Sequence, residues 1–379
     1  MGASDFLAPS VRWTELEHVI VGELAPLVQA IDREGLYPAE AMRSLGKAGA
    51  YRAHLQTQNA FAQADIAGAV QAMSKIGQTC GSTAFMVWCQ DACAWYIEKG
   101  HSAALKQTLL PKVANGEILA GTGMSNPMKY FARIETLKLQ GKKVAGGYVV
   151  NGQLPWVSNL APDNILGTAF EVEGRPGGDA GRGQEVMAIF HCDWPGVALK
   201  PVPSFLGMEG TGTYALHFEN VFVPQDYILA DPIGPWLAGI RCGFVLLQVG
   251  MGLGIVQSCI DHIDRSNHTL GHVNHFLEDS AEQLRVELHD IIERVHAQSD
   301  QVLDSSDANF AEVLTTRLMT SELTLRATQS AMLHNGAAGY ALASPVQRKL
   351  REGYFVAIVT PAIKHLRKEL HRIRSSAQQ

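Results

Sequence analysis

The chain has 379 residues, which is too long for one ordinary hydrophobic core, so we expect two or three domains. Its net charge of −6 argues against a protein that binds nucleic acid, because such proteins normally carry a basic surface. Hydrophobic residues make up 46% of the sequence and charged residues 18%, and this apolar surplus favours surface buried between the subunits of a homodimer or homotetramer.

Residues 11–118 have the pattern of several helices. Apolar residues recur there at intervals close to 3.6, which is typical of helices with one buried face. Cys89 and Cys93 would share a helical face, but two thiols without further ligands do not make a metal site, so we expect apolar packing. The six cysteines of the chain are too few for a disulfide scaffold and fit a reducing cytoplasm.

From about Ile118 to Leu229 the pattern changes to short strands separated by Gly and Pro turns. Residues 185–190 and 214–218 are apolar runs of strand length, and the second run alternates cleanly. Residues 174–183 contain five glycines and one proline, but no helical pattern follows them. We therefore expect a mobile hairpin loop there and not a phosphate-binding loop.

The stretch from 124 to 159 is the most informative part of this region. It opens with a run that Pro127 stiffens, and we expect this run to form a turn that does not continue as a helix. Residues 137–140 and 148–150 have the pattern of short strands. The pair Asn151-Gly152 then predicts a hairpin turn, because both residues tolerate a positive φ.

Trp156 and Ser158 lie near the end of this stretch. If the segment is extended, the indole and the hydroxyl point to the same face, since side chains alternate along a strand. Taken by itself, Trp156 would be interpreted as a core aromatic residue of a β domain. The motifs on either side of it favour a different interpretation.

The last third of the chain is helical again. Residues 240–266 are apolar on nearly every face, so we expect this helix to lie buried inside a bundle. Three more amphipathic patterns follow at 278–302, 309–336 and 345–374. Four long helices after a β region predict an up-down four-helix bundle.

These patterns divide the chain into a helical domain (1–117), a β domain (118–230) and a helical bundle (231–379). The longest apolar run, 243–256, is interrupted by Gln248 and is shorter than the ~20 residues that a membrane-spanning helix needs. We therefore expect a cytoplasmic protein with no membrane segment.

The order and spacing of several motifs resemble the acyl-CoA dehydrogenase superfamily. Residues 124–127 resemble its Thr-Glu-Pro turn, and residues 156–159 resemble its Trp-Ile-Thr-Asn strand. The other matching segments are 109–117, 206–211, 218–224, Gly339-Tyr340 and 345–352. The resemblance implies an α+β fold with an N-terminal helical domain, a middle antiparallel β barrel or sandwich, and a C-terminal four-helix bundle.

The resemblance also implies a flavin, normally FAD, between the β domain and the bundle. A protein must hold the flat ring on apolar surface and place hydrogen-bond donors at its polar edge. Carried over by position, Met124 and Ser125 would supply backbone and hydroxyl contacts. Trp156 would pack on the ring, and the hydroxyl of Ser158 would lie near its N5 atom.

Members of the family oxidise the CH–CH group of an acyl thioester such as an acyl-CoA, and an electron-transfer flavoprotein takes the electrons. A glutamate removes the α-proton while hydride leaves for flavin N5. Counted from Arg351 and Glu352, the usual glutamate position falls on Thr360, and the alternative position falls near Phe244. Neither side chain can remove a carbon-bound proton, so the base is not identified. Glu352 matches a family aspartate of structural type.

Two further departures concern the flavin phosphates. The bulky run 128–132 replaces the family's Gly-Ser-Asp, and residues 267–271 replace its Arg-x-x-Phe-Gly, with Asn267 in the place of the arginine. An amide cannot supply the paired charge of a guanidinium, so His268 or Arg265 would have to compensate. FMN or a loosely bound reduced flavin is therefore the alternative to FAD.

Three functions follow from this resemblance. The first is dehydrogenation of an acyl thioester with a displaced base. The second is a two-component monooxygenase that uses O₂ and reduced flavin from a flavin reductase, because related enzymes of this fold lack the glutamate. The strand 154–156 resembles theirs, although position 359 is Val where they carry a histidine. The third is a protein that keeps the fold and has lost catalysis.

One group of residues has a spacing like that of metal ligands. His268 and His272 would share a helical face, and His275 and Glu278 follow closely. Gly271 interrupts the run, and the resemblance places it at a loop of the bundle near the flavin phosphates. We therefore expect polar or phosphate-facing histidines and no metal site.

Overall fold

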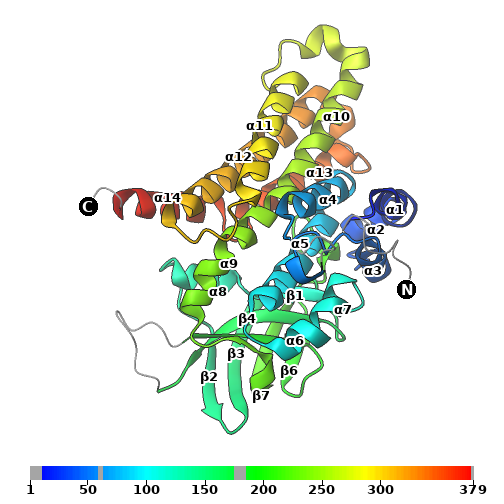
Figure 1. The fold of residues 1–379 in the computed structure, drawn as a ribbon. Coiled ribbons are helices and arrows are strands. Elements are labelled where there is room, and N and C mark those ends of the chain that lie inside the picture. The colour runs from blue at the N-terminus through cyan, green and yellow to red at the C-terminus, as the bar shows by residue number, and fades with distance from the viewer. Residues whose placement is uncertain (1–10, 59–62, 175–184, 377–379) are drawn as a thin grey trace, which may run out of the picture.

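The computed structural model describes residues 11–58, 63–174 and 185–376, so most of the expected glycine-rich loop lies outside the described residues. Figure 1 shows a sheet at one end of the molecule and long helices at the other, with the first helices packed beside the last ones. The fold is α+β in the order helices, sheet, helices, as the sequence predicts.

The N-terminal helices contribute to a core that they share with the C-terminal helices. Gly254 of the C-terminal part lies against the carbonyl oxygen of Ser74, where any larger side chain would clash. Asp65 caps the helix that carries Ser74 by accepting from the amide of Gly68 at 2.7 Å. These elements are α1 (Trp13–Val19), η2 (Ile20–Leu24), η3 (Ala25–Leu27), α2 (Val28–Arg33), α3 (Ala39–Lys47), η4 (Gln56–Gln58), α4 (Ile66–Thr79), α5 (Gly81–Lys99), α6 (Ala103–Thr108) and α7 (Leu110–Ala114).

The middle part forms one eight-stranded sheet with a separate hydrophobic core. Its strands are β1 (Ala120–Thr122), β2 (Leu139–Val144), β3 (Gly147–Val157), β4 (Ile165–Val172), β5 (Glu185–His191), β6 (Val197–Lys200), β7 (Tyr214–Pro224) and β8 (Ile228–Ala230). Their order is β6-β7-β3-β2-β4-β5-β8, and β1 also pairs with β4. The sheet is mostly antiparallel, but β4 runs parallel to both β1 and β2.

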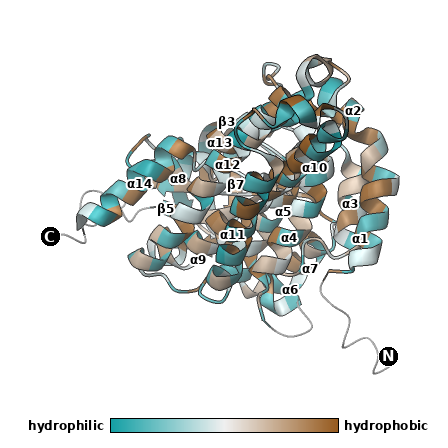
Figure 2. Ribbon diagram, turned by 90° about the horizontal axis from the view of Figure 1, so that it is seen from above, coloured by the Kyte–Doolittle hydropathy of each residue, from teal (hydrophilic) through white to brown (hydrophobic). Residues whose placement is uncertain are grey.

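The C-terminal helices form the bundle, and α14 projects from it at the C-terminal end (Figures 1 and 2). They are α9 (Ile233–Leu247), α10 (Val249–Asn274), α11 (Ala281–Ser299), α12 (Asp307–Tyr340), α13 (Pro345–Ile358) and α14 (Ile363–Ser376). Ser280 and Gln283 make a reciprocal capping box at the start of α11. The segment Ile233–Asn274 is long and apolar enough to cross a membrane, but 94% of its most apolar window is buried inside the protein.

Two local predictions were wrong. Asn151 and Gly152 lie inside β3, and the hairpin turn between β2 and β3 falls at Ala145 and Gly146. Pairing of β3 with both β2 and β7 outweighs the local turn preference. The pairing of β3 with β7 shifts its register between Val150 and Gly152, as at a β-bulge. The expected helix 345–374 is two helices, because the break between α13 and α14 contains a proline that cannot donate a helical hydrogen bond.

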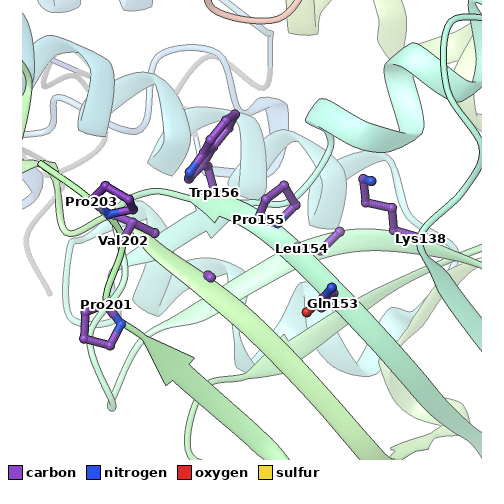
Figure 3. A pocket seen from close by; sticks show the side chains of 9 residues that line it. Lys138, Gln153, Leu154, Pro155, Trp156, Pro201, Val202 and Pro203 are labelled. Carbon is purple, nitrogen blue, oxygen red and sulfur yellow. The ribbon is translucent and has the colours of Figure 1, made fainter. Parts of the chain in front are cut away.

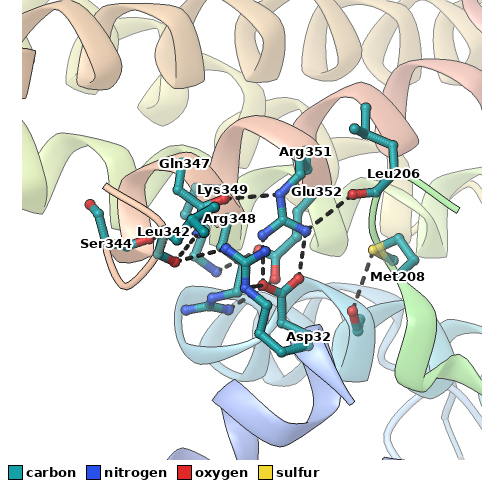
Figure 4. A network of polar contacts seen from close by, with 12 residues as sticks. Asp32, Leu206, Met208, Leu342, Ser344, Gln347, Arg348, Lys349, Arg351 and Glu352 are labelled. Carbon is teal, nitrogen blue, oxygen red and sulfur yellow. Dashed lines mark hydrogen bonds and ion pairs between the residues drawn. The ribbon is translucent and has the colours of Figure 1, made fainter. Parts of the chain in front are cut away.

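Helix α13 is attached to both other parts of the chain by buried charges (Figure 4). Glu352 is buried and forms ion pairs with Arg348 at 2.9 Å and with Lys349 at 3.0 Å. Arg351 binds both carboxylate oxygens of Asp32 in α2 at 2.6 Å. It also donates at 3.2 Å to the carbonyl oxygen of Leu206, which belongs to the β part. Glu352 therefore has the structural role that the sequence indicates.

We predict that Glu352→Gln destabilises the protein by about 3–5 kcal/mol, because it leaves two buried cations without a countercharge. Burial raises the pKa of Glu352, but Lys349 and Arg348 together bring it below its ordinary value. A depressed folded-state pKa contributes stability above the unfolded pKa, and this contribution disappears as the pH falls through the folded pKa.

Urea unfolding at neutral pH and at acid pH measures this effect. The difference between wild type and Glu352→Gln should be large at pH 7 and should shrink as the pH falls through the lowered folded-state pKa of Glu352. Glu282→Gln is the control, because Glu282 is exposed and pairs with Arg285 at the surface. An equal loss in both variants at pH 7 would contradict the prediction.

Candidate functional site

The segments that contain the four predicted flavin contacts lie side by side at one end of the sheet. Met124 and Ser125 follow β1, while Trp156 and Ser158 lie at the end of β3. A Cβ atom on Gly121 would lie 2.5 Å from the carbonyl oxygen of Ser158, so glycine is required for this close approach. The side-chain amide of Asn159 also donates to the carbonyl oxygen of Ala120 at 2.9 Å.

Trp156 presents an exposed indole beside a pocket of about 260 Å³. Its side chain is 60% exposed, and its only aromatic neighbour among the described residues is Phe205, in an edge-to-face contact with ring centroids 6.4 Å apart. The pocket is lined by 153–156 of β3, by Pro201 to Pro203 and by Lys138 (Figure 3). Trp156 is therefore not a core residue, and its flat apolar face is available to a ligand.

The other three predicted contacts differ in their accessibility. Ser125 is exposed, and its hydroxyl lies 2.9 Å from that of Thr360. Ser158 is half-buried and its hydroxyl is 2.7 Å from that of Thr213. Met124 is only 1% exposed, and its amide donates to the hydroxyl of Thr122 at 3.4 Å. Thus Trp156 and Ser125 are exposed, whereas Ser158 is half-buried and Met124 is buried, and all three hydrogen-bonded residues have a threonine as partner.

The run that begins at Met124 was predicted to be a turn, but it starts helix α8 (Ser125–Phe131). Pro127 lies in the first turn of this helix, where its missing N–H costs nothing. The helix is anchored to the sheet because the hydroxyl of Tyr130 donates to Glu185 at 2.6 Å. A helix with bulky side chains therefore occupies the place of the small Gly-Ser-Asp run.

Neither expected position of the catalytic glutamate offers a carboxylate. Phe244 is 2% exposed and packs between Trp88 and Tyr96, with ring centroids 5.2 Å and 6.0 Å away. It is a core residue. Thr360 lies between α13 and α14, and its hydroxyl meets Ser125 at the boundary between the bundle and the β part.

A chain of hydrogen bonds connects Thr360 to a buried arginine. The amide of Gln248 donates to the carbonyl oxygen of Thr360 at 2.8 Å, and its own oxygen accepts from Nε of Arg317 at 2.8 Å. Arg317 also binds Ser321 and donates to the carbonyl oxygen of Val356 at 2.7 Å. The chain therefore runs from α12 through the α9–α10 junction to the segment that contacts Ser125.

Arg317 is fully buried, and no carboxylate of the described residues pairs with it. Burial lowers the pKa of Arg317 to about 10, so the guanidinium remains charged at neutral pH. Sequence reasoning missed both Arg317 and Gln248. A usable signal was present, because Gln248 is the single polar residue in an apolar run and a buried amide needs a partner.

The segment expected to approach the flavin phosphates is helical and not a loop, because α10 continues to Asn274. Asn267 accepts at 2.9 Å from the side-chain amide of Asn274, so part of its hydrogen-bonding capacity is used internally. His268 and His272 are exposed on this helix, and His275 is exposed directly after its end. Within the described ranges, no three His, Cys, Asp or Glu side chains are grouped so that they could hold a metal ion.

These residues fit the ring of a flavin better than its phosphates. The exposed indole of Trp156 lies near the end of β3, and the exposed hydroxyl of Ser125 lies in the segment that follows β1. The arginine and the small residues expected at the phosphates are absent. The order of helices, β part and helices defines a protein with the fold of the acyl-CoA dehydrogenase type.

Comparisons with known proteins agree with this class. Residues 14–117 match the family model "Acyl-CoA dehydrogenase, N-terminal domain". The "Probable acyl-CoA dehydrogenase YngJ" of Bacillus subtilis is 22% identical over 89% of this chain and 90% of its own length. The isovaleryl-CoA dehydrogenase of Arabidopsis thaliana is 30% identical, but the match spans only 51% of this chain and 46% of that protein.

Solved structures show the same fold. Butyryl-CoA dehydrogenase from Megasphaera elsdenii superposes with a TM-score of 0.83 over 97% of both chains, at 16% identity. Dibenzothiophene monooxygenase from Paenibacillus superposes with a TM-score of 0.79 over 95% of this chain and 96% of that chain, at 14% identity. The chain belongs to the acyl-CoA dehydrogenase superfamily.

We predict that Gln248→Leu destabilises the protein by about 1–3 kcal/mol, because it leaves Nε of the buried Arg317 and the carbonyl oxygen of Thr360 without these hydrogen bonds. Urea unfolding measures the loss. Gln257→Leu is the matched control, since Gln257 is half-buried on the same helix and binds only Asp261 at 2.8 Å. Equal stability of the two variants would show that the chain of hydrogen bonds contributes little.

Proposed function

We propose that this protein is a flavin-dependent oxidoreductase that acts on the CH–CH group of an acyl thioester, with its proton-removing base displaced from both usual positions. The observation that carries the proposal is the exposed indole of Trp156, which lies at a sheet end next to the chain segment of Ser125. The sequence relatives that match over most of this chain are described as acyl-CoA dehydrogenases, which supports the same class of reaction.

In this proposal Trp156 packs against the flavin ring, and Ser125 and Ser158 direct hydroxyl groups at its polar edge. A bound flavin would supply the redox chemistry by taking up the two electrons of the substrate. FAD is the first candidate. FMN is an equally good candidate, because the residues expected to contact the flavin phosphates are missing. An electron-transfer flavoprotein is the proposed acceptor of the electrons.

A second function is favoured by Thr360 and Phe244, which replace the carboxylate at both expected positions. A monooxygenase that receives reduced flavin from a reductase and uses O₂ does not need a base for the α-proton. The structural likeness to dibenzothiophene monooxygenase supports this candidate at the level of the fold. The chain would then bind reduced flavin and an oxygenation substrate without an acyl thioester.

The two candidates differ in one experiment on the purified full-length protein. Bleaching of bound oxidised flavin by an acyl-CoA without O₂ supports the dehydrogenase. Consumption of O₂ that depends on added FMNH₂ or FADH₂ supports the monooxygenase. If the protein binds neither oxidised nor reduced flavin, both proposals are wrong and the chain has lost the catalytic function of its fold.

We predict that Trp156→Ala weakens flavin binding roughly tenfold or more, because it removes the aromatic surface on which the ring would lie. Flavin fluorescence titration gives the dissociation constants. Trp13→Ala is the control, since Trp13 is 37% exposed on α1 and far from the sheet end in sequence. An unchanged dissociation constant for Trp156→Ala would remove Trp156 from the site.

A further inference from the structure

Two buried titratable side chains face each other where α5 packs against the turn that precedes η4. His54 and Asp91 are both 0% exposed. Nδ1 of His54 lies 3.9 Å from Oδ1 of Asp91, which is too far for a hydrogen bond. Nδ1 and both carboxylate oxygens have no hydrogen-bond partner among the described residues. Buried polar atoms are nearly always paired in folded proteins, so three unpaired atoms in one pair require an explanation.

The second ring nitrogen of His54 defines which nitrogen carries hydrogen. Nε2 lies 3.0 Å from the backbone carbonyl oxygen of Asp91. A carbonyl oxygen can only accept, so Nε2 carries the hydrogen and donates it. In a neutral imidazole the other nitrogen is then an acceptor, so Nδ1 offers a lone pair towards the carboxyl group of Asp91. A hydrogen on that carboxyl group would supply the missing donor.

Burial disfavours a charge on either side chain. It lowers the pKa of His54 to about 3, although the bond to the carbonyl oxygen of Asp91 opposes this effect, so the ring is neutral at pH 7. Burial raises the pKa of Asp91 well above its ordinary value. An ion pair separated by 3.9 Å, with no hydrogen bond to its carboxylate, would not recover the cost of removing both charges from water. One proton on Asp91 leaves both groups neutral.

The titratable groups around the pair supply no countercharge to Asp91. Lys99, on the same helix, acts on His54 and lowers the pKa of the imidazole further. Tyr51 and Cys89 are buried, and burial raises the pKa of each well above its ordinary value, so both are neutral at pH 7. Within the described part of the chain, Asp91 forms no ion pair with a lysine or an arginine.

We propose that Asp91 is a neutral carboxylic acid at pH 7 and that its O–H group donates a hydrogen bond to Nδ1 of His54. A small rotation of the carboxyl group closes the gap of 3.9 Å. The pair makes the fold sensitive to pH, because loss of the proton leaves a buried carboxylate facing a lone pair. It requires no flavin, so the proposal is independent of the reaction proposed above.

The pair lies next to the side chain that positions the start of β1. Gln90 directly precedes Asp91 on α5, and its side-chain amide donates to the carbonyl oxygens of Val113 at 2.8 Å and Ile118 at 2.9 Å. Its side-chain oxygen accepts from the amide of Ala120 at 2.7 Å. Ala120 begins β1, which leads to the predicted flavin contacts. A charge on Asp91 would therefore act on the turn of α5 that holds this strand.

The first test compares wild type with Asp91→Asn, whose amide can donate to Nδ1 and cannot ionise. A raised folded-state pKa contributes stability that is fully present below the unfolded pKa and is lost as the pH rises towards the folded pKa. The unfolding constant of wild type, divided by that of Asp91→Asn, should therefore rise about tenfold per pH unit between pH 5 and pH 7 in urea. Asp290→Asn is the control and should give a constant ratio, because Asp290 is exposed and pairs with Arg294 at the surface.

The second test uses wild type alone, so it does not depend on the folding of a variant. With aspartate labelled with carbon-13 in its carboxyl group, infrared spectra at pH 7 should show a carbonyl band of a protonated acid that shifts on labelling. Asp32 is the other buried aspartate of the described residues, and Arg351 binds both of its oxygens, so it remains ionised.

The two tests separate the possible positions of the proton. A constant ratio of unfolding constants for Asp91→Asn would show that the pair binds no proton and would overturn the proposal. A rising ratio shows that the pair binds one proton but does not assign it to either residue. The absence of the labelled band would then place the proton on His54 and would also overturn the proposal. A rising ratio together with the band is the expected result.

Discussion

The buried guanidinium of Arg317 constrains the arrangement of the bundle through three hydrogen bonds. A buried charge without a countercharge is costly unless its donors are satisfied. Its partners belong to the α9–α10 junction, to α12 itself and to the end of α13. These elements must keep their relative positions, because a shift of any one of them would leave one buried N–H group of Arg317 without its acceptor.

This constraint extends to the boundary between the bundle and the β part. Gln248 holds the backbone of Thr360, and the hydroxyl of Thr360 then meets that of Ser125. A short side chain at position 360 brings the two parts together directly. The position where relatives keep a catalytic acid therefore has a structural use here, and the aromatic packing of Phe244 gives the second such position a structural use as well.

The sequence was sufficient for features that depend on local periodicity. The order of helices, strands and helices follows from the spacing of apolar residues, and the buried position of the first half of α10 follows from its largely apolar composition. Asn151-Gly152 misled the interpretation because long-range pairing along β3 outweighs a two-residue preference. Pro127 misled it because a proline that ends a helix elsewhere is tolerated in a first turn.

The polar clusters could not be predicted in the same way, because their members are far apart in the chain. Gln248 and Arg317 are brought together by helix packing. Arg241 of α9 and Glu369 of α14 are brought together in the same way, and both line one pocket. Pro361, which lines that pocket, directly follows Thr360, which meets Ser125. The pocket thus lies against the segment that joins the bundle to the predicted flavin contacts. Thr360 therefore lies between this pocket and Ser125, at the position where the resemblance places the carboxylate of a catalytic glutamate.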